Sequence, residues 1–309
     1  MGNFFTLDYL MDFGFSVIRM STPLIYCAMG ALISMHAGQI NMAMEGILLS
    51  SSLIGVLFSA WTHSLWGGVL GAILGGIIIS LVMGYMNIII DADMMLTGIS
   101  LNQLAAGGTI YVLFAVTNTK SSTQGLQSLV FPSWEIPLIK DIPIIGEILS
   151  GHNVLTYAAF LVAILTWLFV FRTKTGLRIR AIGFNPNSAA SVGINVKRVK
   201  FSAFVYSGIF AALGGAFMSM GYLSYWAQNM TAGRGFIGIS ATNLASGNVL
   251  LAVLASVFFG LMDALSISLQ TMNLRFQLVQ MIPYLATVIG LVILSIVRDK
   301  RAKAKRAGK

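Results

Sequence analysis

The sequence predicts an all-α protein, a polytopic bundle of about eight to ten membrane-spanning helices. Two observations predict this fold class, and a third excludes other classes. Of the 309 residues, 57% are hydrophobic and only 9% are charged, whereas soluble domains average roughly 25% charged residues. The apolar residues form long runs, which the alternating pattern of a membrane β-barrel does not have. The single cysteine, Cys27, excludes a disulfide framework and a cysteine-ligated metal site.

Eight segments are long and apolar enough to cross a bilayer core of about 30 Å, which requires about 20 residues. They cover residues 14–33, 40–60, 66–90, 96–117, 153–171, 201–222, 249–270 and 279–297. The segment 235–247 is shorter and more polar, and it is a candidate half-span or re-entrant helix. Gly67, Gly71 and Gly75 recur at intervals of four in the third span, so we expect another helix to pack closely there.

The basic residues are concentrated in two segments that set the predicted topology. The formal net charge is +9, and fourteen of the 19 lysines and arginines lie in residues 172–200 and 298–309. The positive-inside rule places both segments, and with them the C-terminus, in the cytoplasm. Five spans precede the first basic segment, so the N-terminus and the loop 118–152 are expected outside. The tail is interpreted as a topology anchor near the lipid bilayer, with no nucleic-acid partner.

Intramembrane charges are energetically costly and therefore mark candidate functional positions. Glu45 follows Asn41 by four residues, so the two share a helix face, and nearby glycines favour a broken or closely packed helix. Two roles stay open for Glu45: a hydrogen bond to a neighbouring helix terminus, or a direct contact with a substrate. The substrate-path candidates, all polar residues in or beside apolar segments, are Asn41, Glu45, Asn102, Gln103 and Asn243.

Further candidates lie near the short segment. Arg234 is a lone cation between two glycines, and it is a candidate for binding either the carboxylate of an outer partner or a phospholipid. Asp263 is a second acidic residue within an apolar run. Tyr222, Tyr225 and Trp226 are interpreted as interfacial residues, with stacking on a planar ligand as the alternative.

No catalytic constellation is evident in the sequence. It has no Gly-x-x-x-x-Gly-Lys-[Ser/Thr] phosphate loop, no Gly-x-Ser-x-Gly elbow and no His-Glu-x-x-His metal pair. We therefore expect a protein that moves a solute and is not an enzyme, with no cofactor and no metal in this chain.

The cytoplasmic segment 172–200 is predicted to bind a partner protein. Asn185 and Pro186 begin a turn and N-cap signal, and a short helix is predicted over 188–192, ended by Gly193. A short helix between two spans offers a compact surface for a groove in another protein, although an interfacial amphipathic helix has the same pattern. The partner-contact candidates are Asn185, Pro186, Ser188, Ala189, Ala190 and Gly193.

Three motifs in the sequence resemble segments of one known family. Residues 38–46 read GQINMAMEG, residues 181–195 read AIGFNPNSAASVGIN and residues 231–237 read TAGRGFI. The first resembles the AGxINIGLEG signature of the bacterial ABC-importer permeases for branched-chain amino acids, sugars and nucleosides, although Gln39 stands where the family usually has a small apolar residue. The second resembles the family's cytoplasmic coupling segment, and the third is similar to a segment of its purine-nucleoside branch. The resemblance extends over about residues 14–297.

This resemblance implies a type II-like permease with broken or re-entrant helices that imports nucleosides, with purine nucleosides expected, across the bacterial cytoplasmic membrane. ABC ATPase subunits, which bind Mg-ATP, would dock on residues 178–200. A second permease subunit, different or identical, would complete the path, and an extracytoplasmic binding lipoprotein would deliver the solute. Residues 1–309 would form one transmembrane domain, with 172–200 as its coupling segment and 298–309 as its basic tail.

Other solutes and another transport class stay open. A neutral polar path also suits a sugar or a riboflavin-like heterocycle. An ion-coupled secondary transporter, which needs no ATPase, would use intramembrane acids such as Glu45 and Asp263 to bind protons or sodium.

Overall fold

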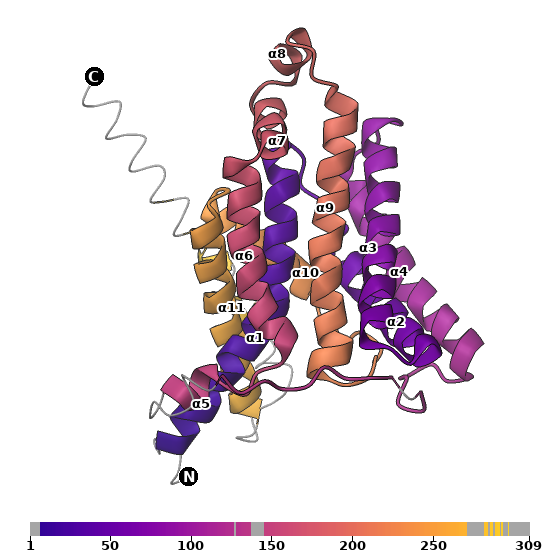
Figure 1. Ribbon diagram of the computed structural model, residues 1–309, viewed down its shortest axis with the longest axis vertical. Coiled ribbons are helices and arrows are strands. Elements are labelled where there is room, and N and C mark those ends of the chain that lie inside the picture. The colour runs from indigo at the N-terminus through magenta and orange to yellow at the C-terminus, as the bar shows by residue number, and fades with distance from the viewer. Residues whose placement is uncertain are drawn as a thin grey trace.

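The chain folds into long helices that run side by side (Figure 1). The computed structural model describes residues 7–126, 128–136 and 145–270, and also residues 281–283, 285, 286, 288–290, 292 and 296. The described helices are α1 (Leu7–His36), α2 (Met44–Thr62), α3 (Leu65–Ile88), α4 (Met94–Thr117), α5 (Ile145–Leu149), α6 (Val154–Arg172), α7 (Lys174–Phe184), α8 (Pro186–Ser191), α9 (Val196–Phe217), the π-helix η1 (Met218–Tyr222), α10 (Arg234–Ala245) and α11 (Val249–Gln270).

Among the described residues, seven helices are long and apolar enough to cross a membrane: α1, α2, α3, α4, α6, α9 continued by η1, and α11. They occupy the first seven predicted spans, which confirms the all-α bundle. The predicted eighth span, 279–297, lies largely outside the described residues. The short segment 235–247 forms α10, whose 12 residues extend for about 18 Å and cannot span a bilayer. This length agrees with the predicted half-span.

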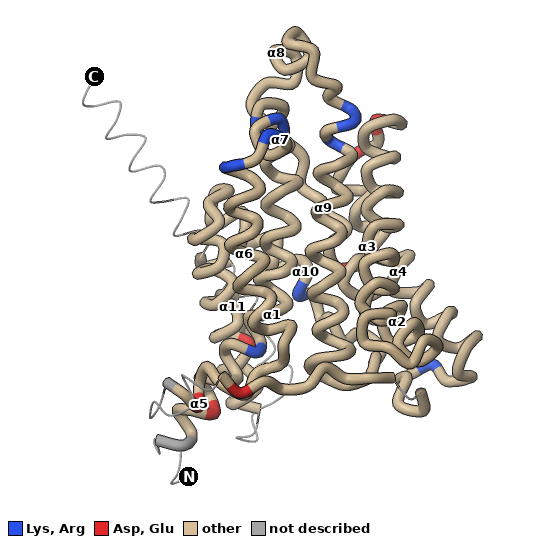
Figure 2. The backbone as a smooth tube through the Cα atoms, viewed as in Figure 1, with Lys and Arg blue, Asp and Glu red and all other residues tan. Residues whose placement is uncertain are grey.

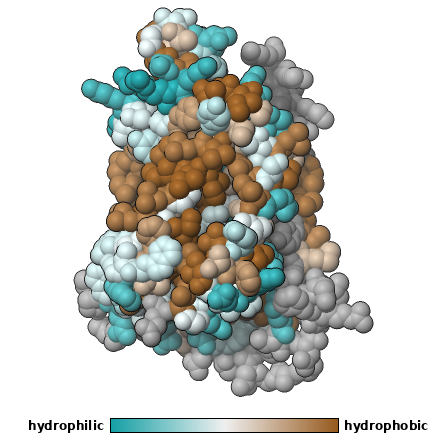
Figure 3. Space-filling model, turned by 90° about the vertical axis from the view of Figure 1, so that its right-hand side faces the viewer, coloured by the Kyte–Doolittle hydropathy of each residue, from teal (hydrophilic) through white to brown (hydrophobic). Residues whose placement is uncertain are grey.

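A belt of apolar side chains surrounds the middle of the bundle. On the face shown in Figure 3, hydrophobic surface covers the middle, and hydrophilic surface lies above and below it. Many large exposed hydrophobic residues belong to α3, α4, α6 and α11, for example Leu74, Leu104 and Ile164. An apolar belt of this kind matches the hydrocarbon core of a membrane, where backbone polar groups must be satisfied within helices.

The two ends of the bundle differ in charge. α7 and α8 extend beyond one end, and Figure 2 shows basic residues gathered on α7 and at the start of α9. The start of α1, α5 and the described parts of the connection between α4 and α6 lie at the opposite end (Figure 1). This arrangement agrees with the predicted topology, in which 118–152 and 172–200 lie on opposite sides of the membrane. The basic tail, 298–309, lies outside the described residues.

α1 is the central helix of the bundle, and it packs against α6, α9, α10 and α11. α9 also packs against α2 and α3. Small residues allow the closest contacts: a Cβ on Gly71 would lie 2.5 Å from the ring of Phe58, and one on Gly75 would lie 2.6 Å from Ile54. Together with Gly67, these glycines form the contact of α3 with α2, which confirms their predicted packing role.

One predicted environment is wrong. Trp226 was expected at the membrane interface, but it is fully buried, and its indole Nε1–H donates to the carbonyl of Leu49 at 3.3 Å. The connection between η1 and α10 folds back into the bundle, where Thr123 accepts the backbone N–H of Trp226 at 2.8 Å. Trp226 is therefore a core residue, because the loop that carries it packs inside the protein.

Candidate functional site

The chain between α1 and α2 is irregular, and we call residues 37–46 the buried junction. Gly38 adopts a φ of +81°, a left-handed conformation that favours glycine, and helix resumes at Met44. The predicted span 40–60 therefore begins four residues late. Asn41 contributes to this delay because its side-chain Oδ1 accepts the N–H of Ala43 at 3.1 Å, a turn interaction that competes with helix.

Asn41 is fully buried and connects three helices. Its Nδ2 group donates to the hydroxyls of Ser80 on α3 at 3.3 Å and Ser207 on α9 at 3.1 Å. Its backbone N–H donates to Ser34 Oγ on α1 at 3.0 Å. Because its side-chain oxygen and both donors have internal partners, Asn41 holds the junction in this conformation, and a place on the substrate path stays a prediction.

Asn102, on α4, clamps the same segment. Its Oδ1 accepts the N–H of Gly46 at 2.8 Å, and its Nδ2 donates to the carbonyl of Met42 at 3.0 Å. The neighbouring candidate Gln103 is exposed on the outer face of α4, and Asn243 is half-buried on α10. The structure therefore brings Asn41, Asn102 and Glu45 together and leaves Gln103 apart from them.

Glu45 binds the first turn of α10. Its Oε1 accepts the N–H of Gly233 at 2.8 Å, and its Oε2 accepts the N–H of Gly235 at 2.7 Å. A Cβ on Gly235 would lie 2.5 Å from the backbone nitrogen of Glu45, so glycine is required for this approach. A carboxylate is favourable here because the first N–H groups of a helix are unpaired and carry partial positive charge. This is the helix-terminus contact that one of the two predicted roles requires.

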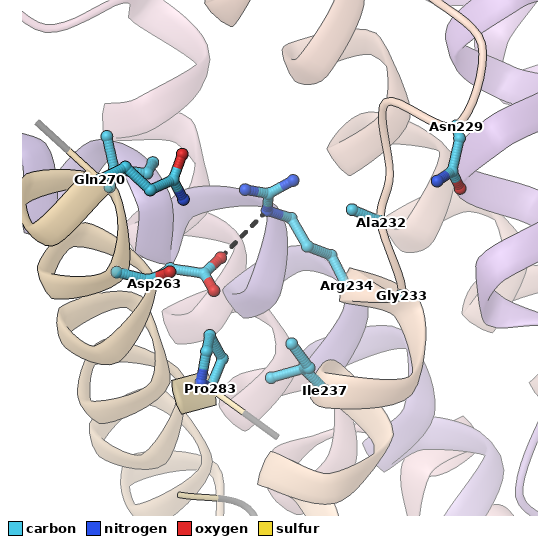
Figure 4. Close-up of a pocket in the computed structure, with 10 residues that line it drawn as sticks. Asn229, Ala232, Gly233, Arg234, Ile237, Asp263, Gln270 and Pro283 are labelled. Carbon is cyan, nitrogen blue, oxygen red and sulfur yellow. Dashed lines mark ion pairs between the residues drawn. The ribbon is translucent and has the colours of Figure 1, made fainter. Parts of the chain in front are cut away.

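Arg234 and Asp263 form an ion pair beside the same turn. The Nε of Arg234 lies 3.2 Å from Oδ2 of Asp263, and both side chains are largely buried. Figure 4 shows the two side chains pointing toward one another from α10 and α11. This ion pair was not predicted from the sequence, although opposite charges in adjacent apolar segments are a signal for such a pair. Contact of Arg234 with an outer partner stays a prediction.

A polar cavity of about 450 Å³ adjoins this ion pair. Its polar lining comes from the loop before α10 and from α10 and α11, and comprises Asn229, Arg234, Asp263, Ser266 and Gln270. The volume is in the range of cavities that accept small organic ligands. One face of α10 is also accessible: Phe236 is exposed, and Ser240 and Asn243, four and seven residues later, are half-buried. These groups offer neutral donors, acceptors and an aromatic ring.

The other candidate region projects from the basic end, and we call residues 184–193 the exposed tip. The predicted N-cap is confirmed, because Asn185 Oδ1 accepts the N–H groups of Asn187 and Ser188, both at 3.1 Å. The short helix, α8, begins at Pro186 and ends at Ser191, earlier than predicted at both ends.

The tip presents apolar residues that the sequence analysis missed. Phe184 is 95% exposed and Val192 is 76% exposed, on either side of α8. Of the predicted partner contacts, Ser188 and Ala190 are exposed, while Ala189 is buried against its own segment. Large apolar residues flanking a short helix in a polar loop are the sequence signal for such a surface.

Comparisons with known proteins agree on one kind of membrane protein. Residues 14–297 match the family described as branched-chain amino acid transport system / permease component. The chain is 30% identical over 287 residues to the nucleoside ABC transporter permease protein NupC of Lactococcus lactis subsp. cremoris, covering 88% of this chain and 89% of that protein. It is 28% identical over 282 residues to the guanosine ABC transporter permease protein NupQ of Bacillus subtilis, covering 88% of each.

A relative that is named for a different substrate is nearly as similar. The chain is 29% identical over 259 residues to the putative glucose ABC transporter permease protein TsgC13 of Haloferax volcanii, covering 84% of this chain and 78% of that protein.

Proposed function

The chain belongs to the family of branched-chain amino acid transport system permease components, and from this premise we propose that it forms the translocation path of an ATP-driven importer for nucleosides. Two of its relatives are named as nucleoside and guanosine permeases, and the guanosine name favours purine nucleosides as the solute. The membrane would be the cytoplasmic membrane, with the basic end of the bundle and the C-terminus in the cytoplasm.

The observation that carries this proposal is the charge balance around the first turn of α10. Glu45 is satisfied by two backbone N–H groups, and Arg234 is paired with Asp263. The neighbouring accessible groups are neutral hydrogen-bonding side chains and Phe236. A nucleoside is neutral, has a planar base and carries several hydroxyls, so this chemistry suits it better than it suits an ion.

The exposed tip supports the proposed docking of ABC ATPase subunits at the basic end. Phe184 is an aromatic residue of the kind that is enriched at the core of protein interfaces, and Val192 adds apolar surface on the other side of α8. The capped turn at Asn185 joins the two in an ordered segment. In this proposal, Mg-ATP binds to the ATPase subunits, a second permease subunit completes the path, and a binding lipoprotein delivers the solute at the opposite end. The chain itself performs no covalent chemistry.

The test is uptake by proteoliposomes that contain this chain with its co-purified partner subunits and binding lipoprotein. We expect uptake of labelled guanosine and adenosine that requires internal ATP and that unlabelled nucleosides suppress. A matched preparation with an ATPase subunit unable to hydrolyse ATP is the control. Nucleoside uptake that persists in that control would contradict an ATP-driven importer.

The same preparation separates the other solutes and the other transport class. The glucose permease relative favours a sugar as the second candidate, so glucose and ribose are tested beside riboflavin and the nucleosides. Preferential uptake of one of these would replace the nucleoside assignment. An ion-coupled transporter using Glu45 and Asp263 would work without ATPase subunits and would respond to an imposed proton or sodium gradient.

A further inference from the structure

The exposed tip and α10 are connected through backbone contacts at the end of α1. A Cβ on Gly183, the residue before the tip, would lie 2.0 Å from the carbonyl oxygen of His36 and 3.1 Å from the nitrogen of Gly38. No side chain larger than hydrogen fits between these two backbones. The end of α7 therefore rests directly on the last turn of α1 and the start of the buried junction.

The side chain of His36 continues this connection to the C-terminal end of α10. Its Nε2–H donates to the carbonyl of Gly247 at 2.9 Å, and a Cβ on Gly247 would lie 3.2 Å from the imidazole ring. The ring also makes an edge contact with Phe171 at the end of α6, with 5.7 Å between ring centroids. One residue thus contacts α7 through its carbonyl and the end of α10 through its ring.

The buried junction and α1 hold α10 at two further points. Glu45 binds the N–H groups of Gly233 and Gly235 at the start of the helix. Midway along it, the hydroxyl of Thr242 donates to the carbonyl of Ala28 on α1 at 2.9 Å. The half-helix is therefore attached at its start, middle and end to one continuous stretch of chain from α1 to the start of α2.

From this geometry we infer that His36, Gly183 and Glu45 are positioning residues that transmit movement of α7 to the half-helix α10. The inference rests on the proposed function, in which ATPase subunits move α7 and α8. A displacement of α7 presses on the backbone at residues 36–38, and the end of α1, the buried junction and α10 move as one unit. Access to the polar groups at the start of α10 changes with the state of the ATPase subunits.

The first test measures nucleoside uptake and ATP hydrolysis in the same proteoliposomes of the complete transporter. Gly183→Ala drives a methyl group into the His36 carbonyl, and we expect about 10-fold less uptake per ATP hydrolysed. Gly107→Ala is the control, because Gly107 also lies in a helix and has nothing within 4 Å of the added Cβ. Unchanged uptake per ATP in Gly183→Ala would overturn the inference.

A second pair of variants decides the matter if Gly183→Ala fails to assemble. His36→Leu removes the donor to Gly247, whereas His36→Gln keeps an N–H donor in that position. We expect His36→Leu to lower uptake per ATP by about 10-fold and His36→Gln to restore most of it. Equal uptake per ATP in the two variants contradicts the inference. Absence of ATP-driven uptake in the unmodified transporter would instead contradict the proposed function.

A measurement without substitutions completes the test. Amide hydrogen exchange is compared between the nucleotide-free transporter and the transporter trapped with ATP and vanadate. We expect residues 36–46 and α10 to change exchange together with α7. A change in α7 with unaltered exchange in α10 would overturn the inference.

Discussion

The buried junction and the exposed tip have similar residues and opposite surroundings. Each contains an asparagine that caps a turn and a glycine with positive φ, +81° at Gly38 and +83° at Gly193. Asn41 is fully buried and bonds to three helices, whereas Asn185 is exposed and its side chain accepts N–H groups from the tip itself. The difference teaches that the motif shapes the backbone in both places, while burial decides whether it holds the bundle together or presents a surface.

The largest effect is expected from removing the buried amide. Asn41→Ala leaves the hydroxyls of Ser80 and Ser207 and the N–H of Ala43 without this partner, and we expect a loss of about 2–4 kcal/mol in the free energy of unfolding. The matched variant Asn185→Ala removes an exposed N-cap and costs about 1 kcal/mol locally. Thermal unfolding of both proteins in detergent measures the difference; equal shifts in midpoint would break the comparison.

The exposed tip should respond in the opposite way, through binding and not stability. Phe184→Ser and Val192→Ser remove exposed apolar side chains, so the unfolding midpoint should stay close to that of the unmodified protein. We expect the affinity for the ATPase subunit to fall by about 10–100-fold, as at interface hot spots. Trp66→Ser on α3, also highly exposed, is the control. ATPase binding that is equally strong in all three variants would exclude the tip as the docking surface.

The two positive-φ glycines give a smaller and more direct contrast. Alanine at either position costs about 1–2 kcal/mol of backbone strain. At Gly193 nothing lies within 4 Å of an added Cβ, whereas at Gly38 it would lie 3.3 Å from Cα of Gly183. We therefore expect Gly38→Ala to destabilise the protein by about 1 kcal/mol more than Gly193→Ala, measured by thermal unfolding. Equal losses in the two variants would show that the contact of Gly38 with α7 relaxes at no cost, and a larger loss in Gly193→Ala would contradict the prediction.

The smallest effect is expected at His152, a buried side chain at the end of the bundle opposite the exposed tip. Burial lowers the pKa of His152, and the charge of Arg19 acts in the same direction, although the hydrogen bond to the carbonyl of Ile148 opposes them. The folded protein therefore favours the neutral imidazole, whose ring stacks on Phe15 at a centroid distance of 3.9 Å. The unfolded chain binds a proton below about pH 6.5, so the stability that this residue contributes is lost as pH falls below that value.

His152→Phe removes this titration and retains an aromatic ring against Phe15. Between about pH 7.5 and about pH 5.5, we expect the thermal unfolding midpoint to fall further in the unmodified protein than in the variant. An equal decrease in the midpoint of both proteins would show that His152 is not buried in the detergent-solubilised protein.

The span positions could be predicted because the bilayer imposes a length and a composition on each helix. The predicted span 249–270 has the same bounds as α11, Val249–Gln270. The start of α2 was predicted four residues early, because hydropathy does not register the turn at Asn41. The N-cap at Asn185 was predictable for a different reason: its partners lie two and three residues away.

The contacts of the intramembrane charged residues could not be predicted from the sequence, because their partners lie far away along the chain. Glu45 and Gly233 are 188 residues apart in the sequence. Their hydrogen bond forms only because the start of α10 packs beside the start of α2. The structure shows what Glu45 and Arg234 contact within the chain, whereas contact of Glu45 with a substrate and of Arg234 with an outer partner stay predictions.

The amino-acid sequence alone determined a membrane bundle, the order of its spans, its basic end and its resemblance to ABC permeases, because these depend on composition and on local patterns. Only the tertiary structure decided which polar groups meet at the start of α10 and that the end of α1 contacts both α7 and α10. Hydrogen bonds and backbone contacts require atoms within about 3 Å of each other, and such distances follow from how the helices pack.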